Sequence, residues 1–193
     1  MSEALRLGPE HAEALEEAQN CYPSGLRETL PRLKDKLTLL DQSDFTSAWG
    51  LFEGNSLIAY VIAFPRKSLL EDRSKETVLG IDDLWVSPRH TGKLYSLLKI
   101  LHFDLEEAQL AHLDIEALSR RSFYRLVEQH PEVFRRIGYE VLGSYVYWED
   151  RIGEEMCWVR FSPLIARERK VGNDEVELSD ALLEEMSYGW ESE

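Results

Sequence analysis

The stretch that decides the fold contains Ile81-Asp82-Asp83-Leu84-Trp85-Val86-Ser87-Pro88 and the leucine-rich segment that follows it. Thr77–Val86 is rich in apolar and β-branched residues and ends at a Ser-Pro pair, which predicts a strand. From Thr91 to Gln109, leucines recur at intervals of three and four residues, which predicts an amphipathic helix. Because a strand followed by a long helix begins a β-α-β crossover, we expect part of the sheet to be parallel.

Short elements alternate on both sides of this segment. Before it, the sequence predicts a strand at Leu5–Leu7, helices beginning at Gly8-Pro9 and at Leu26, and a hairpin of Thr46–Phe52 and Leu57–Phe64. After it, we expect a strand at Leu110–Leu118, helices from Arg120 and over Glu132–Ile137, and strands at Tyr139–Trp148 and Met156–Phe161. We expect Pro31 to kink or restart a helix, Ser119 to cap the N-terminus of a helix and Gly138 to end a helix. This order predicts an α/β domain over 1–163, with a mixed, partly parallel sheet flanked by helices, and an acidic tail over 164–193.

The formal net charge of −14 disfavours nucleic acid as a partner, because such binding depends on Lys and Arg neutralising phosphates. It favours a cationic substrate or partner. Residues 172–193 contain eight acids and no Lys or Arg, so much of the acidity lies in the tail.

No apolar run reaches the roughly 18 residues that span a bilayer, and the first residues lack a secretion-signal pattern, so we expect a cytoplasmic protein without a membrane segment. Cys21 and Cys157 are expected in the core, and no Cys/His spacing suggests a metal site.

The element order resembles that of the GCN5-related N-acetyltransferase (GNAT) superfamily over residues 3 to 162. Two segments carry the resemblance. Ile81–Pro88 with Gly92 is similar to the family's fourth strand and acetyl-CoA loop, where "(I/L)-E-D-L-(Y/F)-V-x-P" is a common form. Phe134-Arg135-Arg136-Ile137-Gly138-Tyr139-Glu140 is similar to the "Y-x-x-x-G-F-x" end of the family's fourth helix.

The resemblance implies an acetyl-CoA site between the fourth and fifth strands. Backbone groups of Leu84, Trp85 and Val86 would bind the pantetheine arm. The pyrophosphate would lie at the start of the following helix, where unpaired N–H groups and a partial positive charge favour anions. The residues implied there are Arg89, His90, Thr91, Gly92, Lys93 and Leu94. The chain departs from the family loop, "(Q/R)-x-x-G-x-(G/A)", at Leu94.

The resemblance also implies a carboxylate base, for which Asp82 is the first candidate and Asp83 the second. Because adjacent strand residues point to opposite faces, we expect only one of them to face the site. Glu116 is a further candidate base. Phe134 stands where the family has a proton-donating Tyr, so Tyr124 or Tyr139 would have to replace it. For each acid, the alternative is a structural hydrogen-bonding role.

Other polar and aromatic positions carry weaker expectations. Tyr22 and Trp49 are candidates either for a substrate pocket or for the core. His102 and His112 are expected at the surface.

These observations predict an acetyl-CoA-dependent N-acetyltransferase that acts on a primary amine of a small molecule, a polyamine or a protein by direct transfer. A non-catalytic binding module of the same fold and an acyltransferase with a different donor are the alternatives. The sequence leaves open the acceptor, the acyl length, the role of the tail and the oligomeric state, a homodimer included.

Overall fold

The computed structural model describes residues 2–22, 24–42, 47–68, 76–118 and 122–164. These residues form one sheet with the strand order β1-β2-β3-β4-β5-β7-β6. The strands are β1 (Glu3–Arg6), β2 (Ser47–Glu53), β3 (Ser56–Lys67), β4 (Thr77–Val86), β5 (Leu113–Leu118), β6 (Tyr139–Glu149) and β7 (Glu154–Pro163). Neighbouring strands are antiparallel except β4 and β5, which are parallel. The mixed, partly parallel sheet expected from the sequence is therefore confirmed.

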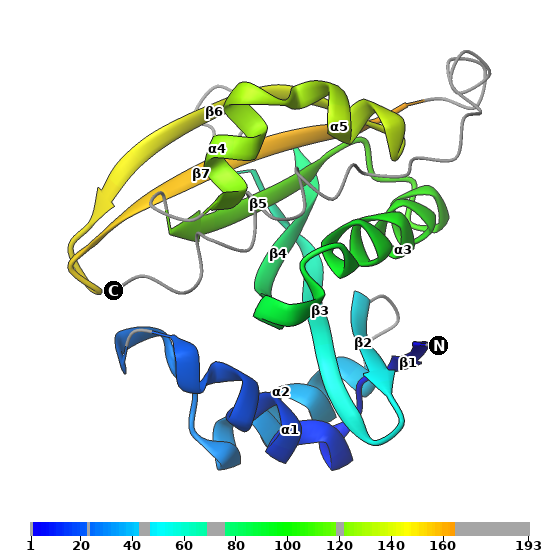
Figure 1. Ribbon diagram of the computed structural model, residues 1–193, viewed down its shortest axis with the longest axis vertical. Coiled ribbons are helices and arrows are strands. Elements are labelled where there is room, and N and C mark those ends of the chain that lie inside the picture. The colour runs from blue at the N-terminus through cyan, green and yellow to red at the C-terminus, as the bar shows by residue number, and fades with distance from the viewer. Residues whose placement is uncertain (1, 23, 43–46, 69–75, 119–121, 165–193) are drawn as a thin grey trace.

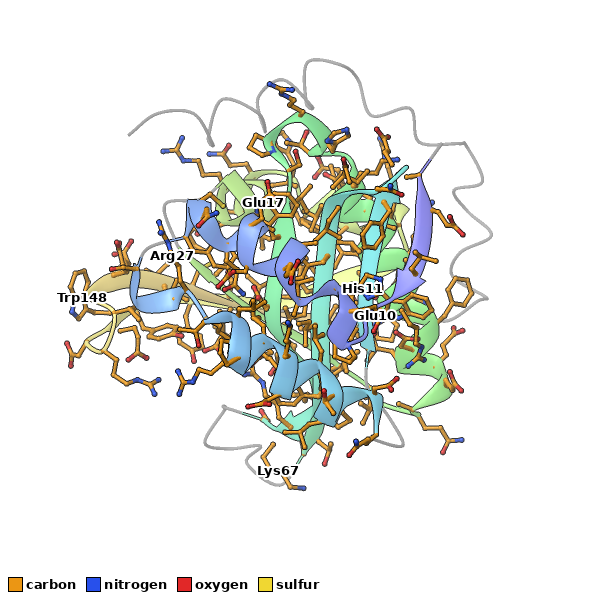
Figure 2. All side chains as sticks on the ribbon, turned by 90° about the horizontal axis from the view of Figure 1, so that it is seen from below. Glu10, His11, Glu17, Arg27, Lys67 and Trp148 are labelled. Carbon is orange, nitrogen blue, oxygen red and sulfur yellow. The ribbon has the colours of Figure 1, made fainter. Side chains whose placement is uncertain are left out.

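Helices lie on both faces of the sheet (Figure 1). On one face, α1 (Ala12–Ala18) and α2 (Leu30–Asp41) pack against β1–β4 through a buried cluster that includes Leu15, Leu37 and Tyr60. On the other face lie α3 (Lys93–Glu107), α4 (Ser122–Gln129) and α5 (Pro131–Arg136), over a larger apolar cluster. Seen from the α1–α2 side, the β6–β7 hairpin projects beyond these two helices and carries Trp148 at its end (Figure 2).

Several local expectations hold for clear physical reasons. The leucine stripe of α3 is buried, as its spacing predicts. Gly138 ends α5 with a φ of +96°, a conformation that glycine adopts without strain. Pro31 stands in the first turn of α2 and so begins the helix instead of kinking it. The expected cap at Ser119 and the helix start at Arg120 lie outside the described residues.

Some expected burials are wrong. Cys21 is exposed at the end of α1, whereas Cys157 is buried as expected. His102 is buried, with its ring edge-on to Tyr139 at 5.3 Å, because α3 turns this position toward β6. Among the described residues, no helix is both long and apolar enough to cross a membrane.

Candidate active site

The parallel strands β4 and β5 separate soon after they meet. Their pairing consists of Leu79 opposite Leu113 and Gly80 opposite Asp114. Beyond Gly80, β4 continues to Val86 and β5 to Leu118 without pairing to each other. The two strands therefore enclose a gap that opens toward the carboxyl end of β4.

Glycine is required at the point where the strands separate. The Arg66 side chain lies directly over Gly80, so closely that a Cβ atom built on Gly80 would be 2.0 Å from Arg66 Nε. This path lets the Arg66 guanidinium cross β4 and reach Glu116 on β5, at 3.2 Å. An ion pair between β3 and β5 thus holds the closed end of the gap.

Backbone groups of β4 point into the gap. Ser87 donates its N–H to the Ile58 carbonyl at 2.9 Å, which makes Ser87 and Ile58 a hydrogen-bonded pair across β3 and β4. Because such pairs alternate along an antiparallel ladder, the N–H and C=O groups of Leu84 and Val86 face away from β3. They face the side on which β5 no longer pairs with β4. These are the backbone groups that the family resemblance assigns to pantetheine.

A β-bulge changes the orientation of the two aspartates. On β3, Ile62 pairs with Asp83 and its neighbour Ala63 pairs with Ile81, so Asp82 is an extra residue on β4. Asp82 reaches Lys36 of α2, and Asp83 is bonded to Gln19, at the end of α1. The bulge interrupts the alternation of side chains, so both aspartates contact residues of the α1–α2 side instead of lying on opposite faces of β4.

Asp83 is the centre of a partly buried hydrogen-bond cluster. Its carboxylate accepts bonds from the Tyr60 hydroxyl at 2.6 Å, the Gln19 amide at 2.8 Å and the Tyr22 hydroxyl at 2.9 Å. Burial raises the pKa of Asp83, although the two tyrosines, Lys36 and Gln19 oppose that shift. Burial and the nearby Asp83 charge also raise the pKa of Tyr22 and of Tyr60.

Tyr22 connects this cluster to the gap. Its hydroxyl lies 2.9 Å from Asp83 Oδ1 and also 2.9 Å from the carbonyl oxygen of Leu84. A tyrosine hydroxyl has one proton and therefore cannot donate to both acceptors at once. When Asp83 is protonated, it can donate to Tyr22 Oη while Tyr22 donates to Leu84. The cluster can therefore hold an additional proton without losing a hydrogen bond.

Asp82 lies in a different environment from Asp83. The Lys36 ammonium contacts Asp82 and, at 2.6 Å, Glu28. Burial lowers the pKa of Lys36, but the bonds to the two carboxylates outweigh burial and raise it. Lys36 therefore stays charged and compensates the charge of Asp82, which makes Asp82 a weaker candidate base than the sequence suggested.

The other predicted acid-base residues also have hydrogen-bond partners. Glu116 accepts a bond from Tyr147 of β6 at 2.7 Å in addition to its ion pair with Arg66. Tyr124 donates to Glu128 one turn along α4, at 2.5 Å. Tyr139 is buried and donates to the Leu98 carbonyl at 2.7 Å.

Phe134 is fully buried against Phe161 and has no proton to donate. Tyr22 is thus the hydroxyl that the structure brings beside the gap. The sequence around Tyr22 did not predict an acid-base role for it, although a place in a substrate pocket was one of the two alternatives for this residue.

The turn after β4 leads directly into α3. A short 3₁₀ turn, Pro88–His90, precedes the helix, and backbone bonds use the N–H groups of His90, Leu94 and Tyr95. For the N–H groups of Thr91 and Gly92, the described residues provide no backbone acceptor. These two amides lie at the positive end of a 15-residue helix, which is a suitable place for an anion.

The remaining residues of the expected cofactor loop differ in exposure and in hydrogen-bond partners. Arg89 is exposed, whereas Leu94 is buried in the core. His90 pairs with Glu53 at 3.5 Å, and Lys93 donates to Ser2 at 2.8 Å. Trp85 points to the α1–α2 side, where its ring stacks on Tyr60 at 6.2 Å, and by the same alternation its N–H and C=O face β3, so neither its ring nor its backbone faces the gap.

The α1–α2 connection reaches the β6–β7 turn across the α1–α2 side of the sheet. A Cβ atom built on Gly25 would lie 3.5 Å from Ile152 Cγ2, which is ordinary contact distance. In Figure 2, the labelled Arg27 lies on the same side as the projecting hairpin that ends near Trp148. The segment that follows Tyr22 is therefore supported by the hairpin as well as by α1.

No family model and no curated protein matches the chain by sequence. Solved structures match it by fold. An acetyltransferase of the GNAT family from Streptococcus pneumoniae superposes with a TM-score of 0.59 at 14% identity, covering 86% of this chain and 100% of that one. The ribosomal-protein-S18-alanine N-acetyltransferase from Escherichia coli gives 0.56 at 14% identity, over 86% and 96%. An N-acetyltransferase from Staphylococcus aureus Mu50 gives 0.58 at 12% identity, over 84% and 97%.

These similarities define the class of fold. The seven-stranded mixed sheet with flanking helices is the fold of the GNAT superfamily, as the sequence predicted. At such low identity the similarity concerns the fold, and the chemistry has to be argued from the site.

Proposed function

We propose that this chain is an acetyl-CoA-dependent N-acetyltransferase in which Asp83 is the proton acceptor. The observation that carries the proposal is the arrangement at the gap. Backbone groups of Leu84 and Val86 that have no partner on β5 lie beside a half-buried carboxyl with a raised pKa, and Tyr22 bonds to this carboxyl and to the Leu84 carbonyl. Neither the backbone groups nor the carboxyl would support an enzymatic function alone, because open strand edges and buried acids also occur for structural reasons.

The donor fits the gap by its chemistry. Pantetheine carries amide groups that can replace the missing β5 partners of Leu84 and Val86, and the pyrophosphate can bind at the Thr91 and Gly92 amides. When bound, acetyl-CoA supplies a thioester carbonyl for attack by the amine. The Val86 N–H faces the gap and would stabilise the oxyanion that forms there.

The acceptor would be a primary amine of a small molecule, a polyamine or a protein. An alkylammonium has a pKa of roughly 10 and must lose a proton before it can attack. Asp83 would take this proton, directly or through a water molecule. As the new C–N bond forms and the C–S bond breaks, the thiolate needs a proton, and Tyr22 can pass the one held at Asp83 toward the gap. The ammonium loses two protons on the way to the amide, so one reaches the thiolate through this cluster and the other leaves to solvent.

A non-catalytic module that binds CoA or a protein is the second candidate function. Two observations favour it: Phe134 replaces the proton-donating residue of the family, and the Lys36 ion pair engages Asp82. A donor with another acyl group would leave the residue roles unchanged. A cytoplasmic location, where acetyl-CoA is abundant, remains our expectation.

One experiment separates these functions. The chain is titrated with CoA while its melting temperature is followed, and thiol release from acetyl-CoA is then measured over a panel of amines. Stabilisation by CoA with amine-dependent thiol release supports the enzyme. Stabilisation without release by any amine, in wild type and Asp83→Asn alike, supports the binding module. No shift at a CoA concentration of about 1 mM contradicts both the enzyme and a module that binds CoA, and leaves only a module that binds a protein.

A further inference from the structure

Gln19 is a buried polar side chain beside Asp83. It is 1% exposed and lies in the 3₁₀ turn Gln19–Cys21, which follows α1. Its amide accepts from the Glu28 N–H at 2.8 Å, and it donates to Asp83 Oδ2 at 2.8 Å and to the Tyr60 hydroxyl at 3.3 Å. A buried amide whose oxygen and nitrogen are both bonded is held in one orientation.

The Glu28 N–H determines which way the Gln19 amide faces. A backbone N–H can only donate, so the amide atom that lies 2.8 Å from it must be the oxygen, Oε1. The oxygen and the nitrogen of an amide are similar in size, and this backbone donor therefore decides between the two orientations. The NH2 group is turned toward Asp83, where it can donate but cannot accept a proton.

The two oxygens of Asp83 therefore have different neighbours. Oδ2 accepts from Gln19 and, at 2.6 Å, from the Tyr60 hydroxyl. Tyr60 also receives an N–H from Gln19, which leaves its own proton directed at Asp83. Oδ1 accepts from Tyr22, whose hydroxyl has the Leu84 carbonyl as an alternative acceptor. A proton added to Asp83 can lie on Oδ1 without loss of a hydrogen bond, whereas on Oδ2 it would face an NH2 group that only donates.

We propose that Gln19 is a positioning residue that keeps the exchangeable proton of Asp83 on Oδ1, the oxygen that Tyr22 links to the gap. The catalytic part of this role rests on the proposed function of Asp83 as the proton acceptor. One turn supplies both contacts, because the Tyr22 N–H donates to the Gln19 carbonyl at 2.9 Å. Side chains three residues apart in a 3₁₀ turn lie on the same side. Gln19 thus disfavours protonation of Oδ2, while Tyr22 connects Oδ1 to the gap.

Gln19→Glu tests this role with almost no change in shape. The new carboxylate can still accept from the Glu28 N–H, but its other oxygen replaces the NH2 group beside Asp83 Oδ2. Two carboxylates in contact share one proton, so the Asp83 titration should end about one pH unit or more above its wild-type position. The ¹³C signals of the aspartate carboxyl carbons, followed against pH without substrate, measure this, and Asp83→Asn identifies the Asp83 signal.

Asn20→Asp is the matched control. It makes the same change from amide to acid one residue along the chain, at an exposed position. The Asp83 titration should therefore stay in place in Asn20→Asp.

The kinetic test is the coupling between Gln19 and Tyr22. In the wild-type background, Tyr22→Phe removes the link from Oδ1 to the gap and should lower kcat by about tenfold or more. In Gln19→Glu the shared proton lies at Oδ2, so kcat should already be reduced, and adding Tyr22→Phe should lower it by less than about threefold. A merely structural role of Gln19 predicts that the two effects multiply instead.

If Gln19→Glu does not fold, Gln19→Met decides. It fills a similar space and removes one donor from Oδ2, so Asp83 should titrate at higher pH than in wild type. An Asp83 titration that the Gln19 variants leave in place, or that Asn20→Asp moves equally, would overturn the role of Gln19, as would multiplying effects on kcat. Wild type without amine-dependent thiol release contradicts the proposed function instead, and the titrations, which need no turnover, still decide whether Gln19 keeps the proton off Oδ2.

Discussion

Asp82 and Asp83 are adjacent in the chain and lie on the same face of β4, yet they occupy opposite kinds of environment. Asp82 is partly exposed, and a cation compensates its charge. Asp83 is half-buried, and its hydrogen bonds come from neutral hydroxyl and amide groups. A cation fixes a carboxylate in its charged form, whereas neutral donors in a buried site leave it able to take up a proton. This contrast is the basis of our proposal that Asp83 transfers the proton and that Asp82 has a structural role.

The most direct way to break this comparison is to neutralise each acid in turn. Asp83→Asn should lower kcat by about 10² to 10⁴, the usual contribution of a positioned base, with little change in CoA affinity. Asp82→Asn should lower kcat less than about tenfold. Both values come from thiol-release kinetics, with CoA binding measured by calorimetry. A larger effect at Asp82 would reverse our assignment.

Removing the Tyr22 hydroxyl tests the link between Asp83 and the gap. Tyr22→Phe keeps the ring and loses the bond to the Leu84 carbonyl, so kcat should fall by about tenfold to a hundredfold. Tyr147→Phe removes a similar bond to Glu116, away from Asp83, and serves as the control. Equal effects of the two variants on kcat would show that Tyr22 has no special part in the reaction.

The charge on Lys36 provides a test through pH. Lys36 lowers the pKa of Asp83, so Lys36→Met should raise it and move the acidic limb of the kcat/KM profile to higher pH. Lys34→Met removes a more exposed charge from the same helix and should leave the limb in place. An unchanged limb in Lys36→Met would mean that another group controls it.

The smallest expected effect concerns stability. A carboxyl with a raised pKa in the folded protein favours folding at low pH, and this contribution is lost as the pH rises through the folded pKa. Asp83 therefore opposes folding at neutral pH, and Asp83→Asn should stabilise the protein there by about 1 kcal/mol. The gain should shrink as the pH falls below the folded pKa of Asp83 and should vanish below about 4, where Asp83 is protonated in both states. Thermal melts of wild type and variant across this range measure it.

The acidic tail gives a separate stability test, which rests on the sequence alone. Removal of 172–193 should leave the melting transition nearly unchanged, because few of its residues are apolar. A large loss of stability would show that the tail belongs to the domain.

Periodicity predicted those parts of the fold that depend on one segment at a time. The bounds of β4 were predicted to the residue, and the buried face of α3 follows from its leucine spacing. The orientation of Asp82 and Asp83 could not be predicted, because a bulge depends on how β3 and β4 are aligned. The partners of Asp83 lie 23 to 64 residues away in the chain, and no local pattern connects them.

The bulge lies just beyond the last residue at which β4 pairs with β5. With Asp82 included, β4 has one residue more than the facing part of β3, and a strand with such an excess bends and twists more strongly. This bend follows Gly80, where β5 stops pairing. An excess residue on the β3 side is therefore a physical reason for β4 to turn away from β5. A chain lacking residue 82 would keep the pairs Ile62–Asp83 and Ala63–Ile81 in regular alternation, and its straighter β4 would run on beside β5, narrowing the space for an acyl donor.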